Sequence, residues 1–81
     1  MAINNKLQKI TRVFLNLAET GKLQKENLTL GDYNAVGYML EKFHKGERVI
    51  KNVICENAVK FFKKYDFQTK YHDGRWDISI E

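Results

Sequence analysis

The chain has 81 residues, 43% hydrophobic and 30% charged, a balance typical of a folded globular domain. It contains one cysteine, which excludes an intramolecular disulfide framework and is too little for a zinc site. No apolar run approaches the roughly 20 residues that a transmembrane helix needs, and no secretory signal pattern is present. We therefore predict one cytoplasmic domain spanning residues 1–81, without membrane contact.

Residues 4–20 show the clearest helical pattern in the chain. Apolar side chains recur there at alternating steps of four and three, which places them on one helical face: Ile3, Leu7, Ile10, Phe14 and Leu17. Gly21 follows at the position where a left-handed residue ends many helices. We expect an amphipathic helix that turns this face toward the core.

Residues 30–45 predict a second amphipathic helix. Thr29, three residues before Asp32, resembles a capping box, and Gly46 is suited to the stop. The expected inner face is Leu30, Tyr33, Val36 or Gly37, Leu40 and Phe43. A glycine inside a helix costs about 1 kcal/mol relative to alanine. We therefore expect another helix to pass close to Gly37.

Residues 49–65 are interpreted as a third helix, although the beginning of this segment is ambiguous. Val49 and Ile50 are β-branched and also favour a short strand, so the helix begins at residue 49 or 52. Most apolar residues fall on one side of a helical wheel: Ile50, Val53, Ile54, Ala58, Phe61, Phe62 and Tyr65. We expect Phe61 and Phe62 to lie in the core.

Residues 67–72 and 75–80 predict two strands joined by Asp73 and Gly74, a dipeptide that favours the type I′ turn of a two-residue β-hairpin. Apolar and polar residues alternate on both sides of this turn. The resulting register places Tyr71 opposite Trp76 and keeps the apolar side chains on one face. We expect this aromatic pair to pack together and against the helices.

The predicted fold class is α+β, with three amphipathic helices followed by a C-terminal two-stranded antiparallel β-hairpin. This order resembles the general layout of winged-helix DNA-binding domains, in which the third helix enters the major groove and the hairpin forms a wing. The resemblance covers the whole chain, rests on element order and charge, and matches no family motif. It implies DNA rather than RNA as the partner, with residues 70–77 as the wing.

Positive charge is concentrated in the middle of the chain. Residues 42–64 carry seven basic and two acidic residues, a net charge of +5, whereas residues 65–81 carry two basic and four acidic residues, a net charge of −2. Cations along one surface would bind phosphates. The predicted nucleic-acid contacts are Lys42, Lys45, Arg48, Lys51, Asn52, Lys60, Lys63 and Arg75. An ordinary lysine-rich solvated surface is the alternative interpretation.

A protein-binding adaptor or inhibitor is the second hypothesis, with either an acidic protein surface or a second copy of the chain as its partner. Leu15, Val49 and Val59 lie off the predicted inner faces, and an exposed apolar patch built from such residues would indicate an interface. Tyr38 also lies off the inner face of its helix, where it is free to meet a partner.

The sequence offers little support for catalysis. His44 and His72 belong to no nucleophile or metal-binding motif, and Cys55 borders an apolar helix face, where a thiol is more often inert. We therefore predict a domain that is not an enzyme, with no catalytic residues, metal or cofactor.

Overall fold

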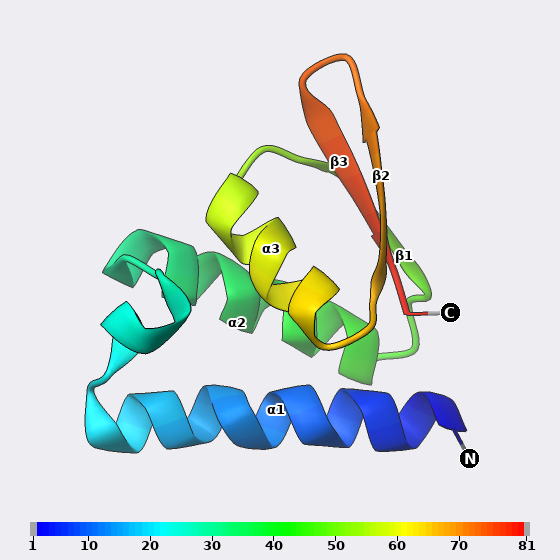
Figure 1. Ribbon diagram of the computed structural model, residues 1–81. Coiled ribbons are helices and arrows are strands. Elements are labelled where there is room, and N and C mark those ends of the chain that lie inside the picture. The colour runs from blue at the N-terminus through cyan, green and yellow to red at the C-terminus, as the bar shows by residue number, and fades with distance from the viewer. Residues whose placement is uncertain (1, 81) are drawn as a thin grey trace.

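The computed structural model describes residues 2–80, with side chains from residue 5 onward. Its elements in chain order are α1 (Ala2–Thr20), the 3-10 helix η1 (Leu23–Glu26), α2 (Leu30–His44), β1 (Val49–Val53), α3 (Glu56–Lys64), β2 (Gln68–His72) and β3 (Arg75–Ser79). The strands form an antiparallel sheet in the order β1-β3-β2, and the helices gather on one side of it (Figure 1). Within the described residues, no helix is long and apolar enough to cross a membrane.

The helix α1 confirms the predicted apolar face. Leu7, Ile10 and Leu17 are buried, and Phe14 is packed against the core. The side chain of Ile3 lies outside the described part. Gly21 ends the helix with a φ of +67°, a backbone conformation that glycine adopts without strain.

The helix α2 begins with the predicted capping box. Asp32 N donates to Thr29 Oγ1 at 3.1 Å, and Thr29 N donates to Asp32 Oδ2 at 3.0 Å. A Cβ added at Gly37 would lie 2.9 Å from Cζ of Phe14 on α1, so the expected close helix approach is confirmed. Leu30 was placed on the inner face and is instead 68% exposed, because it lies in the first turn at the edge of the core.

Residues 49–53 form the strand β1 and not the start of a helix, which corrects the predicted fold. Val49 pairs with Ser79 and Ile50 with Ile78 of β3. The β-branched residues therefore extend the sheet, and α3 begins only at Glu56. The sheet has three strands instead of two, and a strand separates the second and third helices. The second and third helices are therefore joined by residues 45–55, which include β1, and not by the short turn of a helix-turn-helix.

The C-terminal hairpin has the predicted register. Its pairs include His72 with Arg75, Tyr71 with Trp76 and Lys70 with Asp77. Asp73 and Gly74 both have positive φ angles, 49° and 76°, as a type I′ turn requires. Tyr71 contacts Trp76 with ring centroids 4.9 Å apart, but Tyr71 is 60% exposed. The expected packing of Tyr71 against the helices is therefore wrong, since the hairpin extends beyond them (Figure 1).

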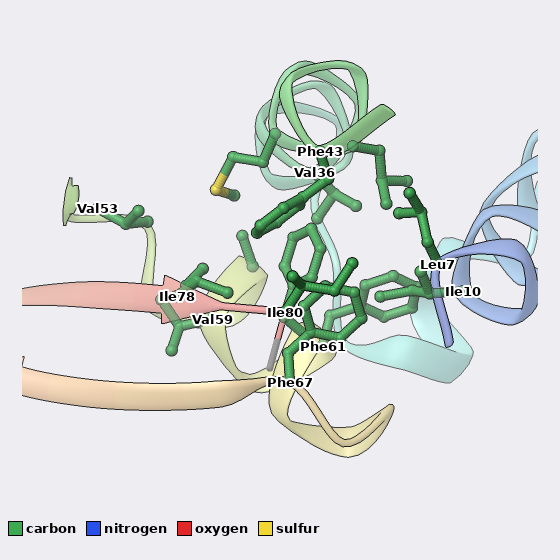
Figure 2. Close-up of a cluster of buried hydrophobic side chains, with 14 of the residues drawn as sticks. Leu7, Ile10, Val36, Phe43, Val53, Val59, Phe61, Phe67, Ile78 and Ile80 are labelled. Atoms are coloured by element: carbon green, nitrogen blue, oxygen red, sulfur yellow. The ribbon is translucent and has the colours of Figure 1, made fainter. Parts of the chain in front are cut away.

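The core lies between the helices and the inner face of the sheet (Figure 2). Phe61 and Phe62 are buried as predicted, and Phe62 lies against Phe67 with ring centroids 5.0 Å apart. Val59 was placed off the inner face of its helix but is 1% exposed and belongs to the core. The short helix α3 is thus buried from two directions, and only one strip of it faces solvent.

Candidate functional site

The eight predicted nucleic-acid contacts do not gather on one surface. They divide among the end of α2 with the loop after it (Lys42, Lys45, Arg48), the strand β1 (Lys51, Asn52), the helix α3 (Lys60, Lys63) and the hairpin turn (Arg75). The hairpin turn and the C-terminal end of α2 lie at opposite ends of the sheet (Figure 1). A single ligand surface can therefore include only part of the predicted set.

The cations at the end of α2 stand next to carboxylates. Lys45 Nζ lies 3.1 Å from Glu41 Oε1, and Lys42 Nζ lies 3.8 Å from Glu47 Oε2. Together with Arg48 this end carries three basic and two acidic groups, a net charge of +1. Exposed ion pairs of this kind contribute about 0–1 kcal/mol to stability. The carboxylates therefore partly neutralise these cations, but the side chains are not fixed in place.

A denser group of cations lies on α3 and η1. Lys60, Lys63 and Lys64 share the exposed side of α3 at helical spacings of three and four, and Lys25 of η1 joins Lys60 and Lys64 around a small hollow. We call Lys25, Lys60, Lys63 and Lys64 the lysine face. With Glu26 and Glu56 nearby, it has four basic and two acidic groups, a net charge of +2.

The lysine face includes two residues absent from the predicted contacts. Lys64 was detectable in the sequence, because it follows Lys60 by one helical turn. Lys25 was not detectable, because it reaches α3 only through the tertiary placement of η1.

Glu26 fastens η1 to the end of α3. Lys64 Nζ donates to Glu26 Oε1 at 2.9 Å, and the Tyr65 hydroxyl donates to Glu26 Oε2 at 3.4 Å. The hydrogen bond to Glu26 raises the pKa of Lys64, and burial, together with the Glu26 charge, raises the pKa of Tyr65. Lys64 therefore stays charged, and Lys25 is held beside α3.

Asp32 fastens the other end of α3. Beyond its bond to Thr29, its carboxylate accepts from Asn57 Nδ2 at 3.0 Å and from the Cys55 thiol at 3.3 Å. The backbone hydrogen bond from Thr29, followed by that from Asn57, lowers the pKa of Asp32 to about 2. Burial, and then Asp32, raise the pKa of Cys55. A thiol that remains protonated is a poor nucleophile, which favours a structural role for this group.

On the outer face of the sheet, Asp77 joins the two edge strands. Its Oδ1 lies 2.9 Å from His72 Nε2 on β2 and accepts from Asn52 N on β1 at 3.2 Å. The hydrogen bond from His72 is the main reason that the pKa of Asp77 is lowered. Asn52 has a φ of +61° where β1 bulges, so its backbone belongs to the sheet's own bonding. No cluster of three or more metal-binding side chains occurs among the described residues.

An exposed apolar area surrounds Ile54, where β1 passes into α3. Ile54 was predicted to point inward on a helix, but the chain is not helical at this position and the side chain is 78% exposed. It lines two adjoining hollows, one toward α2 and one toward the hairpin. We call the exposed residues Tyr38, Ile54 and Tyr71, together with the half-buried Ile50 and Trp76, the Ile54 patch. Contiguous exposed apolar surface of this kind often marks an interaction site.

Three of the four apolar residues predicted to lie outside the core are exposed, and one is buried. Tyr38, Leu15 and Val49 are exposed as expected, whereas Val59 is buried. Tyr38 belongs to the Ile54 patch, and Leu15 lies on α1 beside the charged side chains Arg12 and Glu19. The exposed apolar surface around Ile54 therefore includes Tyr38 but none of Leu15, Val49 and Val59.

Comparison of this chain with protein-family models, with curated proteins and with solved structures finds no match. Two surfaces of the chain itself, the lysine face and the Ile54 patch, are therefore the basis for a functional proposal.

Proposed function

We propose that this domain binds nucleic acid with modest affinity, mainly through phosphate contacts made by the lysine face. The observation that supports this proposal is that Lys60, Lys63 and Lys64 are exposed on α3, and that Lys60 and Lys64 share a hollow with Lys25. Neutralising phosphates releases counterions whatever the base sequence, so such a cluster supports binding without base readout. DNA is the first ligand to test, and the proposal concerns a cytoplasmic binding module and not an enzyme.

The size of the hollow supports this choice of ligand. Its volume is about 130 Å³, and the lining includes the amide side chains Asn27 and Asn57 and the Glu26 carboxylate, which is paired with Lys64. Sites for organic ligands usually enclose about 300–1,000 Å³, whereas one water occupies about 30 Å³ of liquid. The hollow therefore suits a group as small as a phosphate better than a complete cofactor.

The expected affinity follows from the number of cations. Lys60 and Lys64 are separated by about 6 Å along the helix axis, so the face spans few phosphates. With at most four phosphates contacted, the plot of log affinity against log salt should have a slope of about −3.6 or shallower for duplex DNA. A slope of this size means binding that weakens strongly as salt rises.

Fluorescence anisotropy with labelled duplex and single-stranded DNA and RNA tests the proposal. The double variant Lys60→Glu, Lys63→Glu should bind more weakly and with a flatter salt slope. Lys42→Glu, Lys45→Glu is the matched control, because it changes the net charge equally at the end of α2. Equal losses in both variants would indicate a response to total charge alone, and absence of binding at low salt would refute the proposal.

Protein binding is the second candidate function, and the Ile54 patch is the observation that favours it. Lys51 lines the patch, so an acidic protein surface would gain attraction there as well as apolar contact. A protein complex held by apolar contact should persist at salt concentrations that abolish binding to phosphates. Size-exclusion chromatography at high salt therefore separates the two candidates.

A further inference from the structure

We propose that the Ile54 patch is the interface of a symmetric homodimer formed with a second copy of this chain. The proposal is independent of nucleic-acid binding and involves a different surface. Its starting point is Ile54, which is 78% exposed and stands between two hollows. An aromatic side chain flanks it on both sides, Tyr38 toward α2 and Tyr71 toward the hairpin.

This arrangement is self-complementary. A two-fold interface is isologous, so the same patch must supply both halves of each contact. With the two-fold axis close to Ile54, the two Ile54 side chains meet at the centre. Tyr38 at the rim of one copy then faces Tyr71 and Trp76 at the rim of the other. Both outer contacts join aromatic and aliphatic surface, and each occurs twice.

The charges at the rim fit the same symmetry. Lys51 lines the hollow on the α2 side, and Glu56 lines the hollow on the hairpin side. Rotation about the axis brings Lys51 of each copy toward Glu56 of the other. Within one chain, Glu56 Oε1 lies 3.6 Å from Lys60 Nζ, and both side chains are largely exposed. A surface pair of this kind is weak and does not prevent Glu56 from pairing across the interface.

The strand edge nearby does not suit a dimer formed by joining two sheets. The register of β1 shifts between Ile50 and Val53, and Asn52 has a left-handed backbone that donates to Asp77. Bulges and lysines are features that keep edge strands from pairing with another chain. The second copy therefore docks through side chains of the Ile54 patch and not through backbone hydrogen bonds.

Sedimentation velocity and light scattering over a dilution series, without nucleic acid, test the dimer. The wild-type mass should rise from 9.6 kDa toward twice that value as concentration increases. Ile54→Lys should weaken dimerisation at least about thirtyfold, the effect of losing one central apolar anchor. Leu15→Lys is the matched control, because it replaces another exposed apolar side chain with the same cation and should leave the dimer intact.

A charge exchange tests the placement of the two-fold axis. Lys51→Glu and Glu56→Lys should each weaken the dimer, because like charges then face one another across the interface. The double variant should recover the wild-type dissociation constant to within about threefold. Circular dichroism and thermal unfolding check that every variant is folded. A wild-type monomer at all concentrations, a dimer that survives Ile54→Lys, or a double variant as weak as the single ones would overturn the proposal.

Discussion

The lysine face and the Ile54 patch both adjoin the nine-residue helix α3, but different forces would act between each of them and its proposed partner. The lysine face consists of flexible cations whose attraction extends into solvent and is screened by salt. The Ile54 patch consists of apolar side chains that act only on contact and are nearly insensitive to salt. A short helix can thus adjoin two surfaces of different chemistry, provided that its ends are fixed. Asp32 fixes its first turn and Glu26 its last.

Truncating a core side chain beneath α3 should disrupt the lysine face and the Ile54 patch together. It should also cause the largest loss of stability. Phe61 is buried below the lysine face, with its ring centroid 5.2 Å from that of Tyr65. Phe61→Ala should lower the free energy of unfolding by about 3–5 kcal/mol, measured by urea denaturation. Because a small domain has an unfolding free energy of only about 5–15 kcal/mol, this loss is a large fraction of its total stability. A variant of unchanged stability would show that α3 is not anchored through this ring.

A substitution in the hairpin turn should affect the Ile54 patch and leave the lysine face unchanged. Gly74 lines the hollow on the hairpin side and has a φ of +76°. Gly74→Val forces a β-branched residue into this conformation at a cost of about 1–2 kcal/mol in unfolding free energy. We expect weaker dimerisation with DNA affinity nearly unchanged.

Gly74→Asn is the matched control, since asparagine tolerates positive φ better than valine, and it should remain close to wild type in thermal unfolding. Equal loss of stability in the two variants would contradict the turn as the cause.

The anchor at Asp32 should be sensitive to acid. Its folded pKa, about 2, lies below the ordinary value of 3.8, so the ionised carboxylate stabilises the fold above pH 4. That contribution is lost as the pH falls from about 4 to 2. Because nearby solvent screens this charge, we expect the ionised Asp32 carboxylate to contribute about 1 kcal/mol to the free energy of unfolding.

Asp32→Asn isolates this effect from the titration of other carboxylates. The difference in unfolding free energy between wild type and variant should shrink as the pH falls through this range. A difference that is constant between pH 2 and 5 would show that Asp32 does not act through its charge.

Sequence patterns predicted the parts of this fold that depend on close neighbours. The register of β2 and β3 follows from a two-residue turn and local alternation, and the capping box of α2 spans only residues 29–32. The strand β1 was only an alternative to a helical start for residues 49–53, because its pairing with Ile78 of β3, far along the chain, is not visible in the local pattern. The same limit applies to function. Lys60 and Lys63 were identified on one helix, but Lys25 and the exposure of Ile54 depend on how distant elements meet.

The smallest expected effect comes from neutralising the acid inside the lysine face. Glu26→Gln preserves the side-chain shape and an oxygen that accepts from Lys64, but it raises the net charge of the face from +2 to +3. One charge about 8 Å from a phosphate in water is worth about 0.5 kcal/mol, so DNA affinity should rise about twofold for each phosphate at that distance. The gain should vanish at high salt, and dimerisation should be unaffected. Weaker DNA binding in this variant would mean instead that the ion pair acts mainly by holding η1, and Lys25 with it, against α3.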